Sequence, residues 1–238
     1  MTSPSLVLAA HGRSDGDNRE IERLAERLRE RLGGIRVHTA FHRGAPALAD
    51  GVLHDQGGTV VVPLFTSEGY YSKRVLPDAL RRGYGSRPAA GPFRITRPIG
   101  THPAVPRLVA ERLESAGLLD PDATLVVLGH GTRRDRSSGH ATEVLARALS
   151  TRLDVRQVRA AFLDQPPRLE RVAREHLTDP LVVFPFLISQ GHHLTVDVPE
   201  RSGASSGTAV VAPAFGTLPG LPDLVLDLYH AALPELVS

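Results

Sequence analysis

LVVLGHGTRRDRS, residues 125–137, is the stretch that decides the fold, because a close variant of it, LVLAAHGRSDGDN, occupies residues 6–18. In both copies a short apolar run ends at a histidine followed by glycine, at His11 and at His130. Short apolar runs that end in small or polar residues are typical of parallel β-strands alternating with helices. The chain therefore consists of two related halves, each beginning with a buried strand.

A second pair of matching stretches strengthens the repeat and shows where the halves differ. VVPLFTSEGYYSKRVLP, residues 61–77, returns as VVFPFLISQGHHLTVDVP, residues 182–199. The first copy has Tyr71 where the second has His193. We therefore expect the halves to share a fold and to differ in chemistry.

Composition limits the class of protein. The chain has 238 residues, of which 41% are hydrophobic and 23% charged, values typical of a folded globular protein. No apolar run approaches the roughly 20 residues of a membrane helix, and the start of the chain carries no export signal, so we expect a cytoplasmic protein with no membrane partner. Cysteine is absent, which excludes disulfides, thiolate metal sites and a cysteine nucleophile. The sequence contains no basic run interleaved with aromatic residues, so nucleic acid is not expected as a partner.

The alternation of segments predicts an α/β fold of two tandem, similar three-layer lobes, each with a mostly parallel four-stranded sheet flanked by helices. The seam of the repeat predicts one lobe at 1–118 and the other at 119–238. Strands are expected at 5–10, 36–41, 59–65, 93–98, 124–128, 157–162, 181–188 and 208–214. Helices are expected at 17–32, 46–54, 72–82, 104–116, 140–152, 167–176, 221–233 and, as a short one, after Leu194.

Three histidines, His11, His130 and His193, follow strand ends, where parallel α/β sheets bind their ligands. A neutral imidazole can bind a metal ion or accept a proton near neutral pH. Asp164 follows strand 157–162 and can complete a His/His/Asp site for Co²⁺, Fe²⁺ or Ni²⁺, or can simply open the next helix. His192 is adjacent to His193, so only one of the two is expected to point at a shared site.

The other histidines have no counterpart in the repeat. They are interpreted as surface or helix residues: His38, His42, His54, His140, His176 and His230.

Two histidine motifs together resemble those of a known family. Val127-Leu-Gly-His130-Gly131 and Gly191-His-His193-Leu-Thr-Val-Asp-Val-Pro199 are similar to the motifs of the class II tetrapyrrole chelatases, which insert Co²⁺ or Fe²⁺ into sirohydrochlorin. The Gly-x-His-Pro block at 100–103 adds to the resemblance, which spans nearly the whole chain. It implies a chelatase-like fold and a cobalamin or siroheme pathway, with His130 and His193 as catalytic and metal-binding residues and Asp164 beside them.

The resemblance also implies the partners. The divalent metal ion is a substrate, no organic cofactor is needed, and the other substrate is a tetrapyrrole with eight carboxylates, for which arginines are suitable anchors. Two fused lobes could replace a dimer, so the chain is expected to be a monomer or a homodimer. The residues expected to contact the tetrapyrrole are His11, Arg13, Tyr71, Arg74, Arg133, Arg134 and His192.

The first half departs from the family pattern. Tyr71 stands at its second histidine position and Arg43 at its acid position, which places the expected active site in the second half. The alternative is a relative that binds a metal or a tetrapyrrole without inserting one into the other. A phosphatase-like hydrolase, which the His-Gly pair also suggests, would lack the arginine that clamps phosphate, because Gly129 occupies that position.

Overall fold

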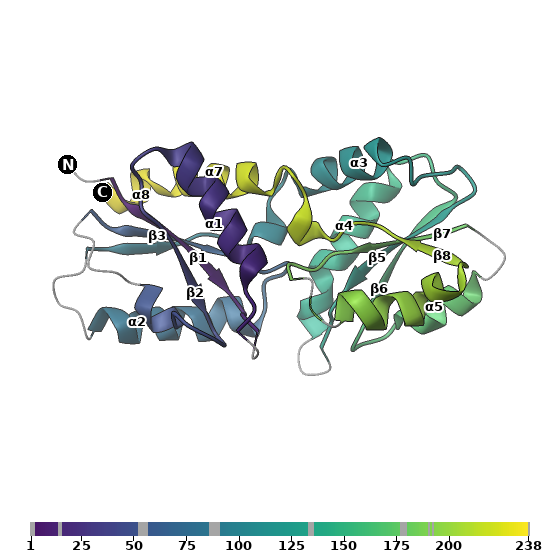
Figure 1. Ribbon diagram of the computed structural model, residues 1–238, viewed down its shortest axis with the longest axis horizontal. Helices are drawn as coiled ribbons and strands as arrows, with labels where there is room; N and C mark the ends of the chain where they lie inside the picture. The colour runs from purple at the N-terminus through teal and green to yellow at the C-terminus, as the bar shows by residue number, and fades with distance from the viewer. Residues whose placement is uncertain are drawn as a thin grey trace. The chain divides into compact units, whose positions relative to one another are not determined.

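Two parallel sheets of the same design organise the chain (Figure 1). The computed structural model describes residues 3–13, 16–51, 57–85, 91–132, 136–176, 180–189, 191 and 193–237. One sheet has the order β2-β1-β3-β4, formed by β1 (Ser5–Ala10), β2 (Val37–Phe41), β3 (Thr59–Pro63) and β4 (Phe93–Ile95). The other has the order β6-β5-β7-β8, formed by β5 (Thr124–Gly129), β6 (Gln157–Phe162), β7 (Leu181–Pro185) and β8 (Ala209–Val211).

The central strands explain the apolar runs of the sequence. Every residue of β1, β3, β5 and β7 is buried, as expected for parallel strands that helices cover on both faces. The two-lobe α/β fold predicted from the repeat is confirmed. The helices that flank the sheets in sequence are α1 (Arg19–Leu32), α2 (Leu76–Gly85), α4 (His140–Ser150), α5 (Leu169–Glu175) and α6 (Val198–Ser202).

The last long helix of each sequence repeat packs in the unit of the other repeat. The first unit comprises Met1–His102 and Gly220–Ser238, and the second comprises Pro103–Pro219. Helix α3 (Val105–Ser115) contacts α4, whereas α7 (Leu221–Ala232) contacts β3 and α1 (Figure 1). The lobe boundary expected at residue 118 from the sequence repeat thus differs from the boundaries of the packing units, because each unit contains the last long helix of the other repeat.

Helix α7 is a structural part of the first unit. The buried Tyr229 donates a hydrogen bond from its hydroxyl to the Pro4 carbonyl, with an O–O distance of 2.6 Å. Arg31 of α1 pairs with Asp223 of α7 at 2.6 Å. The chain ends in α8 (Pro234–Val237), which contacts β4. The apolar face of α7 is covered by the sheet that precedes it by more than a hundred residues in the chain.

The helix predicted after the second strand of each repeat starts later than expected. In the first unit the described part is a 3-10 turn, Leu48–Gly51, because the Phe41 N–H donates to the Pro46 carbonyl at 2.8 Å and keeps that segment beside β2. Phe162 and Pro167 make the same bond at 2.9 Å before α5. Residues 52–54 of the first prediction lie outside the described residues. The strands predicted at 59–65, 93–98, 181–188 and 208–214 end earlier than expected, at Pro63, Ile95, Pro185 and Val211.

The repeated Gly-Thr pairs serve the fold. A Cβ on Gly100 would lie 2.4 Å from the Thr66 backbone, and one on Gly216 would lie 1.7 Å from the Ile188 carbonyl oxygen, so only glycine fits these crossings. The neighbouring threonines each donate to a carbonyl three residues earlier at 2.8 Å, Thr101 to Pro98 and Thr217 to Ala214. These blocks hold the segments that follow β4 and β8 against the loops that follow β3 and β7.

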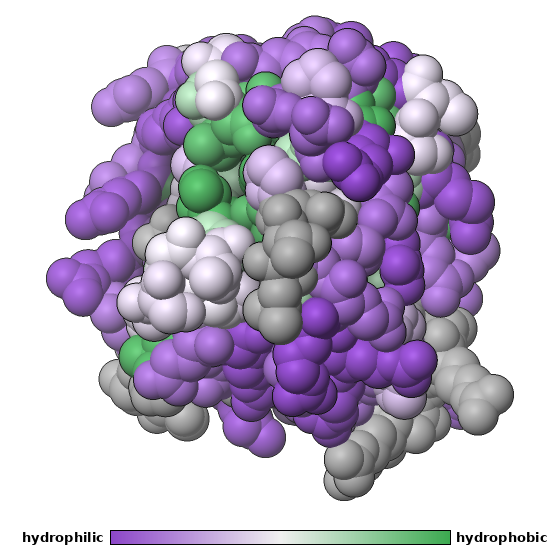
Figure 2. All heavy atoms as spheres, turned by 90° about the vertical axis from the view of Figure 1, so that its right-hand side faces the viewer, coloured by the Kyte–Doolittle hydropathy of each residue, from purple (hydrophilic) through white to green (hydrophobic). Residues whose placement is uncertain are grey.

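Little apolar surface is left uncovered in the second unit. Figure 2 looks onto this unit, where hydrophilic side chains dominate and hydrophobic ones gather in one small area. Among its described residues, the large hydrophobic side chains that are exposed are Val144 and Val210. No helix in the described part of the chain is long and apolar enough to span a membrane.

The close approach at Gly216 can be tested by stability. We expect Gly216→Ala to lower the free energy of unfolding by about 2 kcal/mol or more, because the new methyl group would overlap the Ile188 carbonyl. Gly69→Ala is the control, because a Cβ there meets nothing within 4 Å, and its effect should stay within about 0.5 kcal/mol. Urea denaturation of both variants measures the difference, and equal stabilities would contradict the packing described here.

Candidate functional site

In each sheet the order in which strands are added reverses between the first strand and the third. The chain passes from β1 to β2 on one side and then returns to β3 on the other, and β5 does the same with β6 and β7. Ligands of parallel α/β sheets bind at such a point, outside the carboxyl ends of the strands. His11 and His130 follow β1 and β5, and after the third strand each unit forms a π-helical turn, Tyr71–Val75 or His193–Asp197. The matched motifs therefore lie at equivalent places in the two sheets.

His130 is held by its neighbours in one orientation. Its Nδ1 lies 3.0 Å from the Gly131 carbonyl oxygen and 3.4 Å from Oδ2 of Asp164. Because a carbonyl can only accept a hydrogen bond, this contact places the proton of a neutral imidazole on Nδ1 and leaves the lone pair on Nε2. The His130 and Asp164 side chains are each about half exposed, so a ligand can reach them.

Backbone hydrogen bonds bring Asp164 to this histidine. The Asp164 N–H donates to the His130 carbonyl at 2.9 Å, and the Leu163 N–H donates to Gly129 at 3.1 Å. Gly131 has a φ of +70°, the left-handed conformation that favours glycine and turns the chain sharply after the histidine. The structure thus brings together two of the three residues of the predicted His/His/Asp set.

Gln165 is a residue that the sequence reasoning missed. Its Oε1 accepts hydrogen bonds from the Thr132 N–H at 3.0 Å and from the Ser138 hydroxyl at 3.3 Å. A Cβ on Gly131 or on Gly139 would lie 2.6 Å or 2.3 Å from the Gln165 side chain, so the side chain covers both glycines. Gln165 therefore ties the loop that carries His130 to the start of α4.

The first unit gathers three rings at the equivalent edge. The centroids of His11 and Tyr71 lie 4.7 Å apart, those of His42 and Tyr71 5.0 Å, and those of His11 and His42 5.2 Å. The sequence predicts His42 to be a surface residue without a counterpart in the repeat. It is exposed, but it also belongs to this ring cluster, because its N–H donates to the Ala10 carbonyl at the end of β1.

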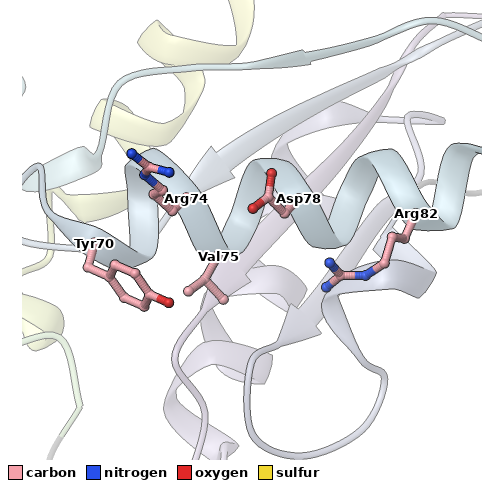
Figure 3. A pocket seen from close by; sticks show the side chains of 5 residues that line it. All are labelled: Tyr70, Arg74, Val75, Asp78 and Arg82. Atoms are coloured by element: carbon pink, nitrogen blue, oxygen red, sulfur yellow. The ribbon is translucent and has the colours of Figure 1, made fainter.

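The predicted arginine anchors of the first unit occupy different places. The Arg13 N–H donates to Oδ1 of Asn18 at 3.1 Å, which fixes the turn after His11. Arg74 is exposed on the π-helical turn and lines a hollow of about 380 Å³ that runs onto α2 (Figure 3). The hollow is lined by Tyr70, Arg74, Val75, Asp78 and Arg82.

Some predicted residues cannot be placed. Arg133, Arg134 and His192 lie outside the described residues, as does the side chain of His193, whose backbone begins the π-helical turn. Among the side chains that are described, no three or more histidines, aspartates or glutamates form a metal-binding group.

His102, in the Gly-x-His-Pro block, is a partly buried histidine of the first unit. Its side chain is 13% exposed, and its Nε2 lies 3.9 Å from Oδ2 of Asp227 on α7. Burial lowers the pKa of His102 below its ordinary value, the Asp227 carboxylate opposes this shift, and the Arg97 guanidinium adds to it. The matching residue of the second unit is Leu218. His102 therefore packs beside α7.

Comparison with known proteins places these features in a wider group. The model of the CbiX family matches residues 5–116 and 124–232, once for each sequence repeat. A protein named "Probable sirohydrochlorin cobaltochelatase" from Halobacterium salinarum is 28% identical over 220 residues, which cover 82% of this chain and 75% of that protein.

Solved structures share the fold. SirB from Bacillus subtilis, solved with Fe³⁺, superposes with a TM-score of 0.82 over 97% of this chain and 96% of its own, and at 18% identity it shares the fold. CbiX, described as the terminal enzyme of siroheme biosynthesis in denitrifying bacteria, has a TM-score of 0.76 at 25% identity, over 96% of this chain and 99% of its own.

The role of Gln165 can be tested by exchange. Gln165→Leu removes the acceptor of the Thr132 N–H, so we expect hydrogen exchange at that amide to quicken at least about tenfold and stability to fall by about 1 kcal/mol. Gln165→Glu keeps the acceptor and should preserve the protection. Amide exchange followed by NMR measures both, and equal protection in the two variants would contradict the assignment.

His102 should make stability depend on pH. Because its pKa is lowered in the folded protein, the unfolded chain binds the proton more readily, and the stabilisation present above the ordinary value of 6.5 is lost as the pH falls. In His102→Leu, which introduces the residue of the second unit, we expect a smaller loss of stability between pH 7 and pH 5. Urea denaturation across this range checks it, and parallel curves for the variant and the wild type would refute it.

Proposed function

We propose, because the chain belongs to the CbiX family, that it inserts a divalent metal ion, Co²⁺ or Fe²⁺, into sirohydrochlorin and that its second unit carries the reaction. The observation that supports this most directly is the contact of His130 Nδ1 with the Gly131 carbonyl and the Asp164 carboxylate. The Gly131 carbonyl and the Asp164 carboxylate both lie near Nδ1, so a neutral imidazole in this position carries its lone pair on Nε2. Such a nitrogen can bind the incoming ion or accept a proton.

The reaction needs both abilities. Two pyrrole N–H protons leave the macrocycle as the metal ion enters, and no electron is transferred. A neutral imidazole accepts a proton near neutral pH, and a carboxylate across its other nitrogen stabilises the imidazolium that results. We assign proton acceptance or metal binding to His130 and His193, with Asp164 stabilising His130. The ion is a substrate in this scheme, and no organic cofactor takes part.

The negative charge of the macrocycle gives the arginines near the strand ends a role as substrate anchors. A tetrapyrrole with eight carboxylates is held well by guanidinium groups, whose fork of donors matches a carboxylate. Arg74 is exposed along one side of the hollow in Figure 3, and Arg13 follows His11 at the edge of the first sheet. We assign substrate contacts to these two and, from the sequence, to His11, Tyr71, Arg133, Arg134 and His192.

Activity is tested with purified protein, sirohydrochlorin and Co²⁺ under anaerobic conditions, by following the absorption change of the macrocycle. We expect insertion above the uncatalysed rate, a loss of roughly 10²-fold in His130→Ala and in His193→Ala, and a loss of about tenfold in Asp164→Asn. His230→Ala removes an exposed imidazole on α7 and should leave the rate unchanged.

Two other outcomes would lead to different conclusions. Tight binding of metal or tetrapyrrole without insertion would show the non-catalytic relative, and full activity in both histidine variants would move the reaction out of the second unit.

A further inference from the structure

We propose that Arg168 and Arg201 act together as positioning residues of the second unit. They hold the peptide group between Leu163 and Asp164 in one orientation, and that orientation places the Asp164 carboxylate beside His130. We call this pair the arginine clamp. Its effect on the rate of metal insertion rests on the function proposed above, whereas its effect on the Asp164 backbone does not.

The Leu163 carbonyl accepts a hydrogen bond from each arginine. Nη1 of Arg168 donates to it at 3.1 Å, and Nη1 of Arg201 donates to it at 3.3 Å. A carbonyl oxygen has two lone pairs, so the two guanidinium groups saturate it, and bonds from charged donors are stronger than those between neutral groups. Leu163 is 1% exposed, so water has little access to this oxygen.

The other end of the same peptide group is held as well. The Asp164 N–H donates to the His130 carbonyl at 2.9 Å. Because a peptide group is planar, bonds to its C=O and to its N–H together fix its rotation about the neighbouring single bonds. The direction in which the Asp164 side chain leaves the backbone is thereby set, and its Oδ2 lies 3.4 Å from Nδ1 of His130.

The two arginines come from different segments of the second unit. Arg168 immediately precedes α5, five residues after Leu163. Arg201 lies on α6, which directly follows the π-helical turn His193–Asp197. The bond from Arg201 therefore ties the segment that begins with His193 to the loop that carries the acid.

The first unit has no such clamp. Its matching residues are both alanine, Ala47 for Arg168 and Ala79 for Arg201. The isolated bridges beside β2 and β6 and the two π-helical turns establish this correspondence. That unit also lacks an acid at the position that a clamp would hold, where Arg43 stands. The clamp thus accompanies the acid, and the shared fold forms without it.

The charges of the clamp favour a functional role over a purely structural one. Two guanidinium groups that meet at one neutral oxygen repel each other. Glu170, whose Oε1 lies 3.7 Å from Nη1 of Arg168, offsets part of this repulsion. Among the described residues, Arg201 donates to the carbonyl and forms no ion pair. Since the first unit folds with alanines in these places, the fold alone does not require this arrangement.

Amide hydrogen exchange, followed by NMR without metal or tetrapyrrole, tests the clamp. The double variant Arg168→Ala/Arg201→Ala introduces the residues of the first unit. We expect exchange at the Asp164 amide to quicken at least about tenfold in it, because one end of the peptide group is released. The matching Arg43 amide, which donates to the His11 carbonyl, is the internal control and should change less than about twofold.

Two further variants complete the exchange experiment. Arg171→Ala removes an exposed guanidinium from α5 that bonds to Glu175, and it should leave the Asp164 amide unchanged. Arg201→Lys keeps a cationic donor and should give an intermediate exchange rate, and it replaces the double variant if that protein does not fold.

Insertion kinetics with sirohydrochlorin and Co²⁺ separate positioning from direct contact with the substrate. We expect the double variant to lose about tenfold in kcat at an unchanged KM, because the carboxylate is displaced while substrate contacts remain. In an Asp164→Asn background the same two substitutions should cost less than about twofold, because the arginines act through that carboxylate.

The outcomes distinguish the clamp from the proposed function. Unchanged exchange at the Asp164 amide in the double variant would overturn the clamp. A KM raised about tenfold at an unchanged kcat would make the arginines substrate ligands and would overturn their positioning role. Absence of insertion by the wild-type protein would contradict the proposed function alone, and amide exchange would then decide the clamp.

Discussion

The arrangement of both units depends on one backbone constraint: as the chain leaves the second strand, it hydrogen-bonds to the histidine that ends the first. The Arg43 N–H donates to His11 and the Asp164 N–H donates to His130, at 2.8 and 2.9 Å. Parallel strands that pair in register end at the same edge, so the residue after one strand meets the residue after its neighbour. What differs between the units is only which side chain each such position carries.

That difference sets the electrostatics of each edge. In the second unit a carboxylate lies 3.4 Å from Nδ1 of His130. In the first unit the same position carries the guanidinium of Arg43, which disfavours a cation, and the neighbouring position carries a further imidazole, His42. A duplicated backbone has thus been given two kinds of chemistry without a change of fold.

The sequence predicts the features that depend on the repeat and on the pattern of apolar strands. The apolar runs predicted two parallel sheets, and His130 and Asp164 lie together at the carboxyl edge of the second sheet; their roles stay a prediction. Gln165 was missed because its contacts depend on the left-handed turn at Gly131, which a pattern of polar and apolar residues does not encode. His42 was missed because it has no counterpart in the other half. The side-chain placement of His193 stays a prediction.

The sequence pattern also could not predict which sheet α3 and α7 cover, because an apolar helix face does not encode the element that packs against it. Their exchange means that neither half of the duplicated sequence contains its own final layer. A cut in the connection between α3 and β5 would leave two fragments clasped together, each closing the other's core. Each copy therefore depends on the other for one helix, so deleting either copy would uncover the core of the copy that remains.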